Sequence, residues 1–581
     1  MTSPVKRWRA ALAAIATLGA YALAVGWITW PLASVLSTHL AATALGGQSD
    51  QQHAIWALAW ESHALTTAPS TFLDANIYYP AKHALLYAAA SYGSLPYFAP
   101  VFLTTGNPTL AMNVVFLFGV VLAAAALHLV VVRWTGSYLA GAIAGATFVC
   151  TRWVLWEWLP AAPQYATLVY FPFIVGLAAR EQSDTRGMLV LAVLVALQSS
   201  TDLVYVAPAV FGPLGVLAAA RLVRPTTRRE GARLFGALVV ALVLLAPAYT
   251  GLMWVKWENP DLARQSMWRP LTAVGPISKA LFGRLVAVAV PIVAFVLVAA
   301  GAASRACRPR DADARRARAW ACALTFAVVG TCLALPYNAT WWGHELTNPL
   351  YHFIPALRVI RVPARLGSGG LVGLCLLAGL GFFELTRRLR EWLPSRSAAA
   401  ASIVLALLVC WNLYVDLQQR PWSPADQWEL PAAFPVRPSP APDSPIIAAI
   451  RGRDGPLLEV PVDKFGGADP TAHALAMYRS IFHWRPLLNG YASYWPHGFL
   501  ERMRIVQRLP EPDAIEALWR ETGLALVVVH TASMRERARA WLPLAMGQNA
   551  WLRPVARDHG DVLFEVTPPP GTAPRVDPPA A

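Results

Sequence analysis

Residues 109–132 read TLAMNVVFLFGVVLAAAALHLVVV, an unbroken apolar stretch without a single Asp, Glu, Lys or Arg. A helix of about 20 apolar residues crosses the hydrocarbon core of a bilayer. The stretch is therefore predicted to span a membrane, and Arg133 directly after it is predicted to lie at the membrane surface. His128 is the main ionisable residue inside the predicted spans.

Apolar stretches of similar length recur through the first 416 residues, and about eleven spans are predicted. They lie near residues 10–30, 109–132, 137–155, 163–180, 187–203, 204–222, 234–253, 285–304, 319–336, 366–385 and 398–416. The composition agrees, because 56% of the residues are hydrophobic and only 14% are charged, which is little charge for a soluble protein. The predicted fold class is an α-helical polytopic membrane protein.

Basic residues fall in alternate connections between the predicted spans, on one side of the membrane. The positive-inside rule makes that side cytoplasmic. The N-terminus is then cytoplasmic, whereas the loop at 31–108 and everything beyond about residue 417 are periplasmic. The expected location is a bacterial inner membrane. A cleaved signal peptide is the alternative for the first apolar segment, with Lys6, Arg7 and Arg9 as its basic start.

The composition divides the chain into four parts. Residues 1–416 form the predicted membrane domain, including the long first outer loop at 31–108. Prolines crowd residues 417–445, which suits a stiff extended connector. Residues 446–567 alternate strand-like and helical patterns and predict a small C-terminal α/β domain. A disordered tail is predicted for residues 568–581.

The same residue patterns predict individual helices and strands. In the C-terminal domain, strands are expected at 456–461, 524–529 and 561–566, and helices at 513–521 and 534–542. In the first outer loop, residues 55–66 and 85–104 are expected to be helices in the membrane interface, because Trp and Tyr alternate there with small apolar residues.

Asp50 is the first candidate for chemistry, because it follows the first predicted span on the outer side. A carboxylate there can take the proton of an attacking hydroxyl or orient that hydroxyl. Glu61 comes eleven residues later and shares a face with Asp50 if a helix begins at Asp50. The alternatives are an N-cap role for Asp50 and simple solvation for Glu61.

Glu157 is the only carboxylate in the short second outer connection, where Trp residues surround it. It either pairs with Arg152 or faces Asp50. In the second case the two carboxylates hold a divalent cation, or share the duties of base and positioning group. A divalent cation is accordingly the one cofactor considered.

Three arginines, Arg358, Arg361 and Arg365, lie just outside a predicted span, against the orientation bias of the other basic residues. The planar guanidinium group donates two parallel hydrogen bonds to a phosphate. The three are predicted to bind the phosphate of a lipid, and His344 is a candidate for the same site. The alternative is that they only anchor the helix at the interface.

Several short motifs resemble those of the GT-C class of membrane glycosyltransferases, in particular large bacterial multispan proteins with a periplasmic C-terminal domain. They are 49–50, 57–65, 72–80, 106–108, 357–365, 486–491 and 527–530. The resemblance implies a catalytic acid in the first outer loop, where Asp50 stands, and a second in the next, where Glu157 stands. It also implies a sugar donor linked to polyprenyl phosphate.

The leading hypothesis is a glycosyltransferase acting at the outer face of the inner membrane. Its expected partners are a polyprenyl-phosphate-linked sugar, membrane lipid, and a glycan, lipid or protein acceptor. A lipid-linked glycan flippase is one alternative, which the scarcity of ionisable residues in the predicted spans disfavours. A non-catalytic envelope assembly protein is the other. Nucleic acid is not expected, because the net charge of +15 reflects membrane topology.

Overall fold

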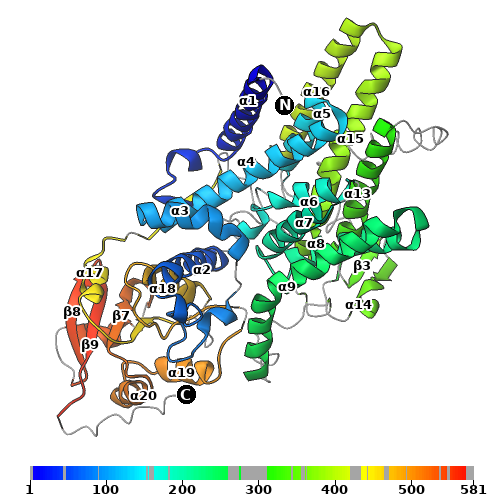
Figure 1. Ribbon diagram of the computed structural model, residues 1–581. Coiled ribbons are helices and arrows are strands. Elements are labelled where there is room, and N and C mark those ends of the chain that lie inside the picture. The colour runs from blue at the N-terminus through cyan, green and yellow to red at the C-terminus, as the bar shows by residue number, and fades with distance from the viewer. Residues whose placement is uncertain are drawn as a thin grey trace.

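The computed structural model describes residues 4–42, 48–88, 91–151, 155, 162–180, 184–258, 274–276, 311–335, 337–341, 344–354, 357, 360, 363–418, 434–440, 442–462, 470–492, 494–534, 538–545 and 550–570. A part made of long helices adjoins a mixed part of helices and strands, which lies at the lower left of Figure 1. Below, they are called the membrane part and, after the side of the membrane predicted for it, the outer part.

The membrane part consists mainly of long helices. They are α1 (Pro4–Ile28), α4 (Pro108–Thr135), α5 (Tyr138–Val149), α6 (Tyr170–Ala178), α7 (Thr185–Ser199), α8 (Val206–Val223), α9 (Arg228–Glu258), α13 (Asp311–Ala334), α15 (Ser368–Trp392) and α16 (Ser395–Gln418). Within the described part of the chain, six helices are long and apolar enough to cross a membrane: α4, α8, α9, α13, α15 and α16. The prediction of a helical polytopic membrane protein is confirmed.

Two predicted spans differ from the structure in extent. The span predicted at 163–180 is helical only over α6, because the chain before it is held in an irregular course by Gln198. The Gln198 amide donates to the Thr167 carbonyl (2.9 Å) and accepts from the Phe171 backbone N–H (3.1 Å). The span predicted at 137–155 ends as a helix at Val149. The span predicted at 285–304 lies outside the described residues.

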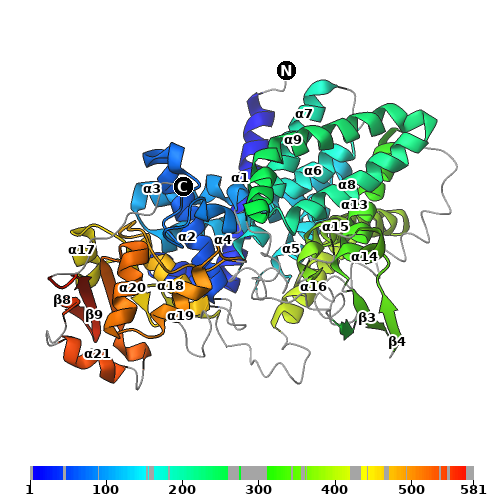
Figure 2. The same ribbon diagram turned by 90° about the horizontal axis from the view of Figure 1, so that it is seen from below.

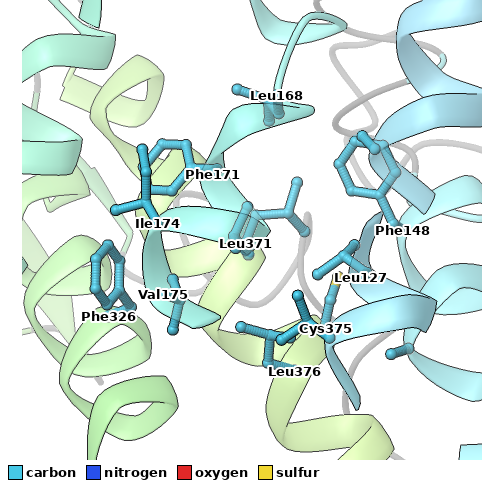
Figure 3. Close-up of a cluster of buried hydrophobic side chains, with 14 of the residues drawn as sticks. Leu127, Phe148, Leu168, Phe171, Ile174, Val175, Phe326, Leu371, Cys375 and Leu376 are labelled. Carbon is cyan, nitrogen blue, oxygen red and sulfur yellow. The ribbon is translucent and has the colours of Figure 1, made fainter. Parts of the chain in front are cut away.

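Apolar side chains and close helix contacts hold the membrane part together. Figure 3 shows Phe171, Ile174 and Val175 of α6 with Phe326 of α13 and Leu371, Cys375 and Leu376 of α15, all buried. A Cβ atom on Gly330 of α13 would lie 2.1 Å from the backbone nitrogen of Gly370 in α15. Small residues therefore let these two helices touch along their backbones, as is common in membranes.

The outward faces of α9 and α16 carry exposed apolar side chains. Val243 is 67% exposed, Leu407 65% and Trp411 65%. Such a surface is unfavourable in water and suits contact with lipid.

The outer part contains a four-stranded sheet in the order β6-β7-β9-β8. Its strands are β6 (Leu457–Val460), β7 (Leu526–His530), β8 (Leu552–Asp558) and β9 (Asp561–Val566), of which β6 and β7 are parallel and the other pairs antiparallel. Around it lie α17 (Pro445–Arg451), α18 (Pro470–Ser480), α19 (Phe499–Val506), α20 (Pro512–Thr522) and α21 (Ala538–Ala545). The predicted small α/β region is confirmed, although β8, α17, α18 and α19 were not predicted.

The first outer loop packs into this region and shares its hydrophobic core. Its elements are β1 (His39–Ala41), α2 (Gln48–Thr67), the short turns η3 (Ala84–Tyr87) and η4 (Tyr92–Ser94), and α3 (Leu95–Thr105). Helix α2 packs against α18 and α3, and α2 and α18 lie together in both views (Figures 1 and 2). The prediction of interfacial helices is wrong for 55–66, because protein covers Ile55, Trp56 and Leu58 completely.

Backbone hydrogen bonds join the first outer loop to the C-terminal region. The Tyr78 N–H donates to the Asn489 carbonyl (3.0 Å), and the Leu487 N–H donates to the Asn76 carbonyl (2.7 Å). In the proline-rich segment, β5 (Val436–Pro438) pairs antiparallel with β1. Three widely separated stretches of chain thus meet in one folded unit.

A small additional sheet lies beside the membrane part. It joins β2 (Val274–Pro276), β3 (Asn338–Trp341) and β4 (His344–Thr347). The helix α14 (Leu350–Phe353) and the turn η12 (Pro363–Gly367) lead from it to α15. This connection carries the segment in which the arginines were predicted to bind phosphate.

Candidate active site

Asp50 lies in the first turn of α2, which begins two residues earlier at Gln48. It is therefore inside the helix and is not its N-cap, although its charge favours the positive N-terminal end of the helix dipole. Its Oδ1 accepts a hydrogen bond from the Tyr491 hydroxyl (2.7 Å), and its Oδ2 lies 3.8 Å from Nη2 of Arg365. The side chain remains 41% exposed, so a ligand can reach the carboxylate.

Arg365 comes from the other part of the molecule, on η12 just before α15. Its guanidinium carbon lies 5.4 Å above the ring of Tyr205, the residue before α8, in a cation–π contact. The structure brings Asp50 and Arg365 together. The two charges face one another where the outer part meets the membrane part.

A buried carboxylate, Asp202, stands behind this pair. It accepts the backbone N–H groups of Val204 and Tyr205 (2.9 Å each) and the side-chain amide of Gln164 (3.3 Å). Burial raises the pKa of Asp202, while these hydrogen bonds and Arg365 oppose the rise. Asp202 therefore fixes the backbone beneath the Tyr205 ring on which Arg365 rests.

A second basic group, Arg437, approaches the site from the proline-rich segment. Its Nη2 donates to Oε1 of Gln51 (2.6 Å), and the Gln51 amide donates to the Ala41 carbonyl (3.1 Å). Burial lowers the pKa of Arg437 to about 10, so the group stays charged at neutral pH. Arg437 was not predicted, and nothing in the sequence distinguishes it from the other arginines after residue 417.

His53 and Tyr491 form an aromatic wall beside Asp50. Their rings meet edge to face, with centroids 5.7 Å apart. Burial lowers the pKa of His53 to about 4, so its imidazole is neutral at neutral pH. The neutral ring supports the tyrosine that holds Asp50. Tyr491 lies in one of the family-like motifs, but the sequence does not indicate that it contacts Asp50.

Glu61 does not join Asp50. It lies eleven residues further along α2, about 16 Å at 1.5 Å per residue. The side chain is completely buried, and neither carboxylate oxygen has a hydrogen-bond partner among the residues that the structure describes. Burial raises the pKa of Glu61 to about 8, so the acid is mainly neutral at pH 7.

The other predicted residues are not placed at the side-chain level. Glu157, Arg358 and Arg361 lie outside the described residues. For His344 the structure gives the backbone position in β4, opposite Trp341 of β3. Within the ranges described above, no group of three or more His, Cys, Asp or Glu side chains is arranged to hold a metal ion.

Comparison with known proteins finds similarity at the level of structure. No family model and no curated protein matches the chain. The oligosaccharyltransferase of Archaeoglobus fulgidus in its apo form is 12% identical, with a TM-score of 0.46, over 96% of this chain and 75% of that one. ArnT from Cupriavidus metallidurans in the apo state is 15% identical, with a TM-score of 0.42, over 96% of this chain and 98% of that one.

A further structure of the archaeal protein, named as AglB, contains an inhibitory peptide and a dolichol-phosphate. It is 11% identical, with a TM-score of 0.37, over 97% of this chain and 75% of that one. These neighbours are GT-C glycosyltransferases. The GT-C class is also the one that the sequence motifs of this chain resemble.

Proposed function

We propose that the protein is a membrane glycosyltransferase that moves a sugar from a polyprenyl-phosphate donor to an acceptor hydroxyl at the outer face of the inner membrane. The observation that carries the proposal is the meeting of Asp50 with Arg365, a partly exposed carboxylate 3.8 Å from a guanidinium group. Such a pair offers a base for the acceptor and a cation for the departing phosphate within one ligand's reach.

In the proposed reaction, the acceptor oxygen bonds to C1 of the sugar while the bond between C1 and the phosphate oxygen breaks. The proton of the acceptor hydroxyl passes to Asp50, and the bonding electrons leave with the polyprenyl phosphate. Tyr491 donates to Oδ1 of Asp50 and fixes the plane of the carboxylate, so that Oδ2 is directed to the reacting side.

Negative charge grows on the phosphate as the sugar departs, and cations placed there in advance stabilise the transition state. Arg365 supplies one such cation, and its stacking on Tyr205 limits its motion. Arg358 and Arg361 are proposed to complete the phosphate site from the same segment. Glu157 is proposed to assist Asp50, and His344 to bind substrate away from the reacting atoms. Glu61 is not proposed to bind substrate, because its side chain is completely buried.

The direct test measures transfer of a labelled sugar from a polyprenyl-phosphate donor by membranes that contain the full-length protein. Loss of a general base reduces the rate about 100-fold or more. Asp50→Asn is expected to show that loss at normal protein levels. Asp443→Asn is the matched control, because Asp443 is exposed and lies away from the site. Transfer by Asp50→Asn at the rate of the control would refute the assignment.

A further inference from the structure

A second cavity, of about 260 Å³, opens in the outer part between the sheet and α17. Val528 and His530 of β7 and Glu459 of β6 line it from the sheet, and Asp561, the first residue of β9, stands opposite His530 in the strand register. None of these residues takes part in the Asp50 site.

Four ionisable side chains form the floor of this cavity. Arg479 Nη1 and His530 Nε2 lie 2.8 and 3.0 Å from Oε2 of Glu459, and His530 Nδ1 lies 2.6 Å from Oδ2 of Asp561. Although burial alone would raise it, Arg479 and His530 hold the pKa of Glu459 at about 2. The imidazole of His530 thus lies between the carboxylates of Glu459 and Asp561, and the guanidinium of Arg479 contacts Glu459.

The floor retains capacity for hydrogen bonds to a ligand. Arg479 is 24% exposed and Asp561 30% exposed. Only Nη1 of the Arg479 guanidinium has a partner within the described part of the chain. The cavity therefore offers at least one donor group and one acceptor group side by side.

His483 adds a donor that has no partner among the described residues. It lines the cavity, is 9% exposed, and its Nδ1 accepts the backbone N–H of Arg485 (3.0 Å). The proton of the neutral ring then sits on Nε2. This buried nitrogen lacks a hydrogen-bond partner among the described residues. A buried donor left unpaired is unfavourable, and because this nitrogen is sealed from solvent, a ligand oxygen would satisfy it only after the His483 ring turns toward the cavity.

The charges of the floor select against charged ligands. A phosphate or carboxylate would meet Glu459 and Asp561, and an ammonium group would meet Arg479 and His530. A hydroxyl group both donates and accepts, so a ligand with several hydroxyls matches neighbouring donors and acceptors. The opposite wall is apolar, formed by Ile446, Ile447 and Ile450 of α17.

The space is small. At roughly 30 Å³ per water molecule, the cavity holds the volume of about nine waters, which suits one sugar ring better than a drug-sized molecule. We propose that this cavity binds a neutral monosaccharide unit of a glycan, with its hydroxyls on the charged floor and its C–H face on the isoleucines of α17. The site is a binding site only, and it does not depend on the proposed transfer reaction.

The cavity is nevertheless linked to the Asp50 site through one loop. The Asn489 side chain accepts the backbone N–H of Glu459 (2.8 Å) and donates to the Glu459 carbonyl (2.9 Å). Two residues later, Tyr491 reaches Asp50. A glycan held in the cavity would therefore sit on the same folded unit that carries the candidate catalytic carboxylate.

The test uses the full-length protein in lipid nanodiscs and saturation-transfer NMR with the methyl glycosides of glucose, galactose and mannose. Inorganic phosphate and ethylamine are the charged comparison probes. Saturable binding of at least one glycoside is expected, without competition by either charged probe. Absence of glycoside binding, or displacement of the glycoside by phosphate or ethylamine, would overturn the proposal.

Variants locate the bound sugar. Asp561→Asn removes a charged acceptor from the cavity floor and is expected to weaken binding about tenfold. Ile447→Trp is expected to abolish binding by filling the cavity. Leu542→Trp is the matched control, because Leu542 lines a different cavity of the same region. Asp50→Asn is expected to bind the glycoside normally, which separates this proposal from the transferase proposal. Unchanged binding by a folded Asp561→Asn variant would assign the sugar to another place.

Discussion

The membrane part and the outer part are held together by different interactions. In the membrane part, helices approach through glycines, as α13 and α15 do at Gly330 and Gly370. In the outer part, distant stretches of chain exchange backbone hydrogen bonds, as Tyr78 does with Asn489. The packing of the membrane part depends on helices that lie side by side. The packing of the outer part depends on contacts between the first outer loop and the C-terminal region.

The candidate active site lies where these two parts meet. Asp50 belongs to α2, whose residues are in the outer hydrophobic core, and Arg365 immediately precedes α15, whose residues are in the membrane core. The distance between carboxylate and guanidinium is therefore set by how the two parts dock. Perturbing either core should have effects that differ in kind from those of perturbing the contact between them.

The largest effect is expected from overpacking the membrane core. Gly330→Val places side-chain atoms where the Gly370 backbone lies 2.1 Å from a Cβ position. The free energy of unfolding is expected to fall by about 3 kcal/mol, with loss of the monodisperse peak in size-exclusion chromatography. Gly26→Val is the control, because no atom lies within 4 Å of a Cβ there. Equal behaviour of the two variants would contradict the close packing of α13 and α15.

A smaller, pH-dependent effect is expected in the outer core at Glu61. Burial raises its pKa from the ordinary value of 4.5 to about 8. Between these pH values the folded protein keeps a proton that the unfolded chain has lost. The free energy of unfolding therefore falls as the pH rises through this window and becomes level above it.

Glu61→Gln is expected to remove this slope and to stabilise the protein by about 1–3 kcal/mol at pH 8. Thermal unfolding of the full-length protein between pH 5 and pH 8.5 measures how the free energy of unfolding changes with pH. Glu501→Gln, at an exposed position of α19, should leave the pH dependence as it is in the unmodified protein. If Glu61→Gln unfolds with the original slope, the buried acid is not the source of that slope.

Much of the membrane part follows from the sequence because the bilayer imposes a simple rule. A spanning segment must be apolar over about 20 residues and must satisfy its backbone groups internally. α4, α8, α15 and α16 obey this rule, and their predicted positions agree closely with the structure. The exception at 163–180 arises where a single polar side chain, Gln198, binds the backbone of the neighbouring segment.

The structure of the outer part is harder to predict from the sequence, because residues far away in the chain surround each of its segments. The sequence of α2 mixes Gln52 and Glu61 with Trp residues, a pattern that also fits a membrane interface. What buries the helix is largely α18, which lies in the C-terminal region. Arg365 could be predicted as a site residue from its unusual side of the membrane, whereas the contact of Tyr491 with Asp50 joins residues 441 positions apart.

The smallest effect is expected at the contact between Tyr491 of the C-terminal region and Asp50. Tyr491→Phe removes one hydrogen bond to a carboxylate that is already 41% exposed, so water can replace the hydroxyl. The kcat of sugar transfer is expected to fall about tenfold, with little change in KM for the acceptor, because the lost bond fixes the base and does not bind the substrate. Thermal unfolding should be unchanged.

Tyr494→Phe is the matched control for this variant. Tyr494 lies three residues further in the same region, and among the described residues the hydroxyl bonded to Asp50 is that of Tyr491. A purely structural role of Tyr491 would lower the unfolding temperature and the rate together, whereas a positioning role lowers kcat in a fully folded protein. If Tyr491→Phe transfers sugar as fast as Tyr494→Phe, the C-terminal region does not take part in setting the geometry of Asp50, and the docking of Arg365 against α2 must do so alone.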